Sequence, residues 1–128
     1  LQGHKFLVVG AEHIDRYGHV NYKAVPGMLE PHQDALLSSR KVSFEGIARQ
    51  LGLKSFVRRL ETIYSGELKE GNMCEVMTQL TLGETSMTFV QSVDRDGAPV
   101  LRFTMVVVMV DEAGNKTPLP EELRKQLS

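Results

Sequence analysis

The sequence predicts one α+β domain over residues 1–128, in which a curved antiparallel sheet wraps around one long central helix. Three observations predict this fold class. The length of 128 residues and the 41% hydrophobic content suit a single domain with one core. Apolar residues recur at helical spacing in the first third of the chain. From residue 55 onward, Val, Thr, Ile and aromatic residues dominate four runs separated by turn residues, and a sheet made from these runs can bury one face against the helix.

The N-terminal third predicts one strand followed by the long helix. Residues 5–13, KFLVVGAEH, are a short run rich in apolar and β-branched residues, which is typical of a strand. Pro26 is tolerated in the first turn of the helix, but the ring of Pro31 would clash with the carbonyl of Gly27, so we expect a kink or a late start near Pro31. The helix is predicted from about Tyr22 to Ser38, because apolar residues repeat with its period at Val25, Met28, Leu29, Ala35 and Leu36.

The rest of the chain predicts a short helix, four strands and a C-terminal helix. Residues 43–52 form the short helix, with Ser43 as its N-terminal cap and Gly52 at its end. The pair Asp96–Gly97 is a strong signal for a hairpin between the last two strands. Pro120 suits the start of the C-terminal helix. The four predicted strands are residues 55–68, 73–82, 86–93 and 100–110.

The last strand predicts a partner subunit. Met105 to Val110 is apolar at every position, so both faces of this strand need cover from water. Because the single long helix can cover only one face of the sheet, we expect another copy of the chain to cover the other face. The protein is therefore predicted to be a homodimer or a homotetramer.

Composition excludes several classes of partner. A net charge of −1 gives no bulk electrostatic reason to expect binding to nucleic acid or to an anionic membrane. The longest apolar run is far too short to cross a bilayer, and the first residues lack the regions of a signal peptide. A single cysteine, Cys74, excludes an intrachain disulfide and fits a reducing cytoplasm. We interpret Cys74 as a small core residue.

A polar loop between the first strand and the long helix is the strongest sign of a functional site. In IDRYGHVNY, residues 14–22, a carboxylate, an imidazole and an amide lie close together in sequence. The stretch resembles the Asp-x-x-Gly-His-Val-Asn signature of the hotdog-fold acyl-CoA thioesterases, the 4-hydroxybenzoyl-CoA thioesterase-like superfamily. The resemblance extends to RRLETIYSGELKEGNMCEV, residues 58–76, and to TPLPEELRKQL, residues 117–127. It implies the hotdog fold for nearly the whole chain.

The resemblance also implies the roles of three residues in this loop. Asp15 would attack the thioester carbonyl carbon or activate a water molecule, since a carboxylate can do either. The main-chain N–H of Tyr22 would polarise the thioester carbonyl, as preorganised backbone donors do for an oxyanion. Gly18 would allow the close approach that this requires. From the sequence alone, the alternative is that Asp15 is a turn or capping residue.

Glu30 is the second candidate for the catalytic carboxylate, because another branch of hotdog thioesterases carries its acid on the central helix. Its alternative is a buried or partly buried glutamate that pairs across a dimer. In MLEPHQDAL, residues 28–36, Glu30 keeps the glutamate of the family's usual Glu-Ala-Arg ending, while Pro31 and Gln33 depart from that pattern.

Four further residues are assigned to substrate binding. His19 and Asn21 border the catalytic loop, although a histidine that holds the loop and an asparagine that caps the helix are alternatives. Arg58 and Arg59 are adjacent on a predicted strand and should point to opposite faces, so that one of them could reach the phosphates of coenzyme A. Solvated surface charge is the alternative for both arginines.

No metal or organic cofactor is expected. The spacing of His13, Asp15 and His19 matches no zinc pattern, and no cysteine supplements them. The resemblance thus implies an acyl-CoA thioesterase that releases a fatty or aromatic acid from coenzyme A, with acyl carrier protein as the other possible carrier. The alternatives are a non-catalytic acyl-CoA-binding hotdog module and a hotdog hydratase or dehydratase. The Asp-x-Asn-Pro-x-His arrangement that is usual in hotdog hydratases and dehydratases is absent from this sequence.

Overall fold

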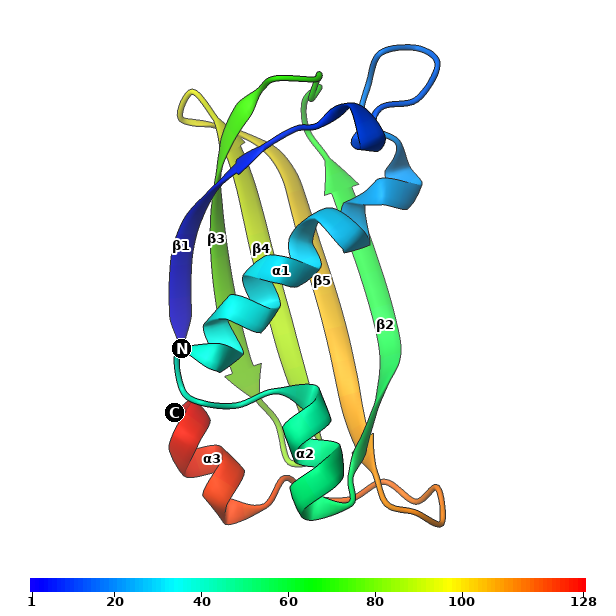
Figure 1. The fold of residues 1–128 in the computed structure, drawn as a ribbon, viewed down its shortest axis with the longest axis vertical. Helices are drawn as coiled ribbons and strands as arrows, with labels where there is room; N and C mark the ends of the chain where they lie inside the picture. Colours follow the sequence, from blue (N-terminus) through cyan, green and yellow to red (C-terminus); the bar gives the residue numbers. More distant parts are fainter.

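One antiparallel sheet of five strands and one long helix make up the body of the molecule (Figure 1). The computed structural model describes residues 1–128. The strand order is β1-β3-β4-β5-β2, so the two edges are the first and second strands in sequence. The strands are β1 (Gln2–Val8), β2 (Lys54–Tyr64), β3 (Met73–Leu82), β4 (Ser86–Arg95) and β5 (Ala98–Val110). The α-helices are α1 (Val25–Ser38), α2 (Phe44–Leu51) and α3 (Glu121–Leu127), and short 3₁₀ turns lie at Ala11–His13 and Tyr22–Ala24.

Two predicted strands are longer than the strands observed. The first strand stops at Val8, and the chain turns at Gly10, whose N–H donates to His13 Nδ1 at 3.1 Å. Strand β2 stops at Tyr64, because the next two N–H groups, of Ser65 and Gly66, both donate to the Val100 carbonyl instead of continuing the ladder. The α+β class and the order of elements are as predicted.

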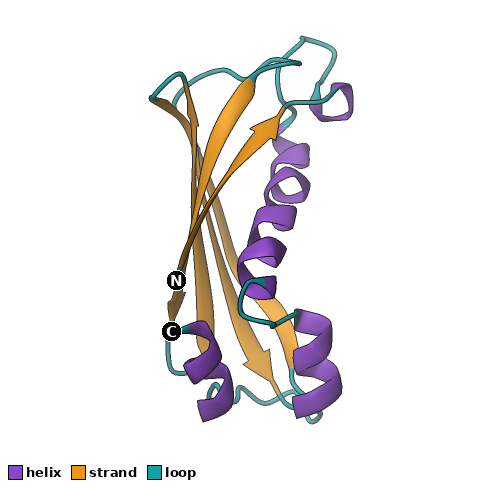
Figure 2. Ribbon diagram, turned by 60° about the vertical axis from the view of Figure 1, so that its left-hand side comes forward, coloured by secondary structure: helices purple, strands orange, loops and turns teal.

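Helix α1 lies along one face of the sheet (Figure 2) and runs without a break from Val25 to Ser38. Of the expected kink or late start near Pro31, the late start is wrong. Pro26 occupies the first turn, where its missing N–H costs nothing. Pro31 removes the donor to the Gly27 carbonyl, but both residues are exposed, so water can satisfy that carbonyl. No helix in the structure has both the length and the apolar character needed to cross a membrane.

The core lies between α1 and the helix-facing side of the sheet. Strands β3 and β4 alternate buried and more exposed residues along their lengths, as expected for a sheet with one face covered. Phe89 and Leu37 are completely buried in one half of this core, and Val76 is completely buried in the other half. Cys74 is also buried, in agreement with its interpretation as a core residue.

The exposed apolar surface that favours a partner subunit lies on β2 and not on β5. The outward-facing Val106 and Val108 of β5 are only 8% and 6% exposed in a single chain, because β5 is an inner strand whose two neighbours cover it. The sequence-based reason for a partner at β5 is therefore wrong. Instead, edge strand β2 exposes apolar side chains on both faces, each at about half of its area: Phe56, Val57, Leu60, Ile63 and Tyr64.

Candidate active site

The loop that carries Asp15 is a tight turn between two bridged residues, Ile14 and Val20. The Asp15 N–H donates to the His19 carbonyl at 2.9 Å, and the Gly18 N–H donates to the Asp15 carbonyl at 3.1 Å. Gly18 has φ +80°, in the left-handed region that glycine adopts without a steric penalty. The glycine of the motif is therefore needed by the turn itself.

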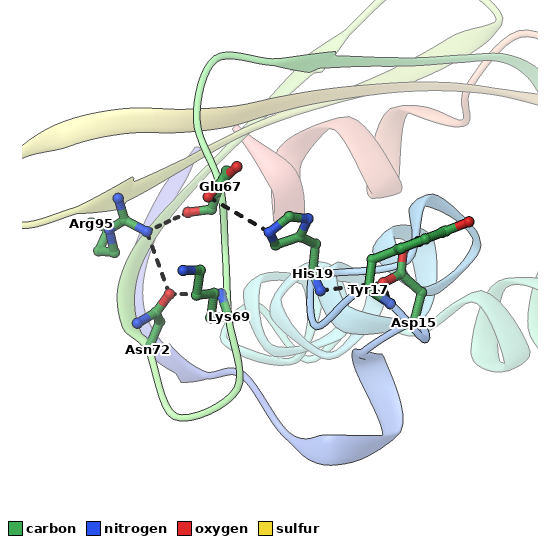
Figure 3. Close-up of polar contacts among 7 residues, drawn as sticks. All are labelled: Asp15, Tyr17, His19, Glu67, Lys69, Asn72 and Arg95. Carbon is green, nitrogen blue, oxygen red and sulfur yellow. Dashed lines mark hydrogen bonds and ion pairs between the residues drawn. The ribbon is translucent and has the colours of Figure 1, made fainter.

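Two backbone N–H groups hold the Asp15 carboxylate in place. Its Oδ1 accepts from the Tyr17 N–H at 2.9 Å and from the His19 N–H at 3.2 Å (Figure 3). Its other oxygen, Oδ2, accepts no hydrogen bond within the chain, and the residue is half-buried. The arrangement orients one carboxylate oxygen and leaves the other available to a substrate or to water.

The Tyr22 N–H lies at the start of the turn that leads into α1. Asn21 caps this turn, with its Oδ1 accepting from the Lys23 N–H at 3.0 Å, and the Asn21 N–H is tied to the His13 carbonyl at 2.8 Å. The Tyr22 N–H donates no hydrogen bond within the chain. It is therefore free to donate to an oxygen outside the chain.

The His19 ring points away from Asp15. Its Nε2 lies 3.7 Å from Glu67 Oε2 on the connector between β2 and β3 (Figure 3), and the two side chains are 44% and 64% exposed. The next residue, Val20, donates its N–H to the Leu68 carbonyl of the same connector at 3.0 Å. His19 thus contributes its backbone to Asp15 and its ring to the connector.

Sequence reasoning missed the residues that brace this connector. Arg95, at the end of β4, donates to the Glu67 carbonyl and, at 3.4 Å, to Asn72 Oδ1 (Figure 3). Asn72 Oδ1 also accepts from the Lys69 N–H at 2.7 Å, which closes the turn. These contacts join parts of the chain that are far apart in sequence, and no local pattern around Arg95 indicated them.

Glu30 lies at a different place from the Asp15 loop. It is exposed on α1 and lines a pocket of about 290 Å³ between α1 and β2, together with Gln33 and Asp34. Neither Asp15 nor Tyr22 lines that pocket. The structure therefore brings Asp15, Gly18 and His19 together and keeps the second carboxylate candidate apart from them.

The two arginines of β2 lie at an irregularity of the strand. The pairing with β5 shifts register between Val57 and Arg59, which leaves Arg58 without a partner residue. The expectation that the two arginines point to opposite faces assumed regular alternation, and the bulge interrupts that alternation at Arg58. Arg59 forms an exposed ion pair with Glu61 at 3.0 Å, whereas Arg58 forms none.

The titratable groups with shifted pKa values lie beside the Asp15 loop or in the core. Burial raises the pKa of the Tyr64 phenol, and the nearby Tyr22 raises it further. Burial also raises the pKa of the Cys74 thiol, which keeps it protonated and unreactive. No group of three or more His, Cys, Asp or Glu side chains is placed to hold a metal ion.

Solved structures with the same fold are thioesterases and related proteins. A 1,4-dihydroxy-2-naphthoyl-CoA thioesterase from Synechocystis is 14% identical with a TM-score of 0.90, covering 99% of this chain and 96% of that chain. A 4-hydroxybenzoyl CoA thioesterase, solved as an Asp-to-Asn mutant complexed with 4-hydroxybenzoyl CoA, is 12% identical with a TM-score of 0.85 and 99% of each chain covered. A hypothetical protein from Staphylococcus aureus in complex with CoA is 15% identical with a TM-score of 0.86, covering 99% of this chain and 82% of that chain.

These similarities confirm the predicted hotdog fold. No curated protein sequence matches the chain significantly. The family model described as the thioesterase-like superfamily matches residues 9–127. Since that match spans almost the whole chain, the protein belongs to the thioesterase-like superfamily.

Proposed function

We propose that the protein is an acyl-CoA thioesterase that hydrolyses a fatty or aromatic acyl thioester to the free acid and coenzyme A. The observation that carries this proposal is the Asp15 carboxylate, oriented by two backbone N–H groups through one oxygen and unpartnered at the other. Membership of the thioesterase-like superfamily supports the reaction class. Structural neighbours that hold CoA or 4-hydroxybenzoyl CoA support coenzyme A as the carrier.

The chemistry requires Asp15 and the Tyr22 N–H to act on the same carbonyl group. As a general base, Asp15 takes a proton from water while the water oxygen bonds to the carbonyl carbon. The Tyr22 N–H stabilises the negative charge that develops on the carbonyl oxygen. The C–S bond then breaks, and the CoA sulfur leaves with a proton. As a nucleophile, Asp15 would instead bond to the carbonyl carbon, and the C–S bond would break so that the CoA thiolate leaves and takes up a proton. Water would then cleave the mixed anhydride, which releases the acid and restores the Asp15 carboxylate.

In this proposal, strand β2 binds the nucleotide part of coenzyme A. Arg58 is the better candidate for the phosphates, because it is exposed and has no carboxylate partner, whereas Arg59 is paired with Glu61. His19 and Asn21 lie beside the catalytic loop and would border the pantetheine end. We assign no metal or organic cofactor to the reaction, and the single buried Cys74 supports a reducing, cytoplasmic setting.

The proposed assembly is a homodimer, or a homotetramer of such dimers, formed through the β2 edge. This strand has 11 residues, a free edge and exposed apolar side chains on both faces. A strand of this kind is a template for pairing, and antiparallel pairing about a two-fold axis joins it to a second copy of itself. Because the Glu30 pocket lies between α1 and β2, the second copy would border that pocket and place it at the subunit boundary.

The test is a hydrolysis assay against a panel of short, long, branched and aromatic acyl-CoAs, with acyl carrier protein thioesters as a second series. Release of free thiol, together with appearance of the acid, supports the proposal. Binding without hydrolysis for every member would instead identify a non-catalytic acyl-CoA-binding module. Addition or loss of water on the acyl chain would identify a hydratase or dehydratase.

A further inference from the structure

A chain of polar side chains crosses the otherwise apolar core beneath α1. Gln33 of α1, Gln91 of β4 and Thr78 of β3 are 3%, 0% and 2% exposed. Gln33 Nε2 donates to Gln91 Oε1 at 2.8 Å, and Gln91 Nε2 donates to Thr78 Oγ1 at 3.1 Å. Gln91 Nε2 also donates to the Leu29 carbonyl of α1 at 3.1 Å. Buried polar groups are kept only where they are paired, so this cluster fixes the position of each member.

The Leu29 carbonyl determines which way both glutamine amides point. A backbone carbonyl only accepts, so the Gln91 atom facing it must be the NH₂ group. The Gln91 oxygen is then the atom that faces Gln33, and Gln33 must offer its own NH₂ group in return. The carbonyl oxygen of Gln33 is consequently turned away from the cluster, and it accepts no hydrogen bond within the chain.

Gln33 borders the pocket between α1 and β2. Gln33 is one of the residues that line this pocket, and the only buried side-chain N or O atom without a partner in the whole chain is His32 Nδ1. The unpaired Gln33 oxygen is therefore not fully buried, and we assign its small exposed surface to the pocket that Gln33 lines. Around it the lining is mostly apolar, with side chains such as Leu60, Phe103 and Met105.

The charges around the pocket limit what can enter it. Glu30 and Asp34 are its only charged lining residues, and no Lys or Arg lines it. A ligand group with a carboxylate would meet two negative charges and no positive one. The pocket suits a neutral group with an apolar body and a hydrogen-bond donor for the Gln33 oxygen.

We propose that Gln33 is the specificity-determining residue of this pocket, and that it selects acyl groups carrying a hydroxyl or another hydrogen-bond donor over acyl groups of the same size without one. This rests on the proposed function, since it treats the pocket as the acyl site. An acyl group without a donor would leave the Gln33 oxygen buried and unpaired when it fills the pocket, and that loss disfavours its binding.

The test uses CoA thioethers, which cannot be hydrolysed, so binding is measured without turnover. One series carries ω-hydroxyalkyl groups of increasing length, and the matched series carry methyl or fluorine in place of the hydroxyl. A second scaffold carries a 4-hydroxybenzyl group with its 4-methyl and 4-fluoro analogues. By calorimetry, we expect the hydroxyl member to bind about tenfold more tightly than both analogues at the length that reaches Gln33.

Two variants assign the preference to Gln33. Methionine has a volume similar to that of glutamine but offers no comparable hydrogen-bond acceptor. Gln33→Met should therefore bind the hydroxyl member and its analogues about equally tightly. Thr78→Val removes a hydrogen bond from the same cluster and leaves Gln33 untouched, so the preference should remain. If Gln33→Met fails to fold, the comparison of hydroxyl, methyl and fluorine on the wild-type protein still tests the proposal.

Four results separate the possible outcomes. Equal binding of hydroxyl, methyl and fluorine members at every length and on both scaffolds overturns the role of Gln33. A hydroxyl preference that survives in Gln33→Met also overturns it, and loss of that preference in Asp34→Asn would move the acceptor to the neighbouring carboxylate. A Gln33-dependent preference in a protein that hydrolyses no thioester supports this inference and overturns the proposed function alone.

Discussion

His19 holds Asp15 through its backbone and not through its ring. Its N–H donates to Asp15 Oδ1 at 3.2 Å and its carbonyl accepts from the Asp15 N–H at 2.9 Å, while the imidazole lies 3.7 Å from Glu67. A histidine acting as general base would need its ring within hydrogen-bond reach of the reacting group. The geometry separates a loop-holding role from a catalytic one, and the two roles predict different kinetics.

We expect His19→Ala to keep kcat within about tenfold of the wild-type value. The two backbone hydrogen bonds to Asp15 do not depend on the side chain, and the His19–Glu67 contact is exposed, so it contributes little to stability. Any loss should fall mainly on KM, since the residue borders the proposed binding site. A fall in kcat of about 10²–10⁴-fold, typical of a lost general base, would place the imidazole in the chemistry.

Gly18→Ala should destabilise the protein and reduce turnover together. Its φ of +80° costs a residue with a Cβ about 1 kcal/mol, although nothing lies within 4 Å of the added carbon. We expect Tm to fall by about 3–5 °C and the loop around Asp15 to loosen. Thermal unfolding and steady-state kinetics measure the two effects.

Gly27→Ala is the matched control for that change. Gly27 also has open space around its Cβ position, but it lies within α1 at an ordinary helical φ. Alanine there should stabilise the protein by about 0.5–1 kcal/mol and leave kcat unchanged. Equal loss of stability in both variants would contradict the role given to the Gly18 turn.

The buried His32 should make stability depend on pH. Burial, and then the charge of Lys5, lower the pKa of His32 below its ordinary value. The folded protein therefore resists protonation more than the unfolded chain does. The stabilisation that comes from a neutral, buried His32 is therefore fully present above about pH 6.5, and it is lost as the pH falls through the lowered pKa. Denaturant unfolding at pH 7.5 and 5.5 should show a loss of stability that His32→Leu reduces. The same loss in both proteins would rule out His32 as its source.

Leu60→Glu should dissociate the assembly without unfolding the chain. Leu60 is 50% exposed on the edge strand β2, so a charge there is tolerated in a single chain and excluded from a paired edge. Phe6→Glu is the control, because Phe6 is 61% exposed on the opposite edge strand, β1. Light scattering should show a smaller particle for the β2 variant only. A wild-type protein that is monomeric and active at low micromolar concentration would contradict the proposed assembly.

The sequence predicted the fold well because its local signals were strong. Ser43 caps α2, with its Oγ accepting from the Gly46 N–H at 2.9 Å, and Gly52 ends that helix in the left-handed conformation. Asp96 and Gly97 both have positive φ and form the predicted hairpin between β4 and β5. In each case, one or two neighbouring residues determine the backbone geometry.

Features that depend on distant contacts could not be predicted in the same way. Arg95 braces the connector at Glu67, and Gln33 pairs with Gln91, but each pair joins residues far apart in sequence. The bulge at Arg58 breaks the alternation on which its direction was predicted. The two outward valines of β5 are covered by their own sheet, which depends on β5 lying between β2 and β4.

If Asp15 carries out the reaction, Asp15→Asn should lose turnover while the protein stays folded. The amide is nearly isosteric with the carboxylate and can still accept from the Tyr17 and His19 N–H groups, so the loop should persist. What is lost is the negative charge that attacks the carbonyl or takes a proton from water.

The measurement is kcat on the best acyl-CoA for Asp15→Asn and Glu30→Gln, with circular dichroism confirming that both are folded. We expect a loss of at least about 10²–10⁴-fold for Asp15→Asn with ligand binding retained, and a smaller effect for Glu30→Gln, mainly on KM. Near-normal turnover by Asp15→Asn together with its loss in Glu30→Gln would rule out Asp15 as the catalytic carboxylate and place that carboxylate on α1.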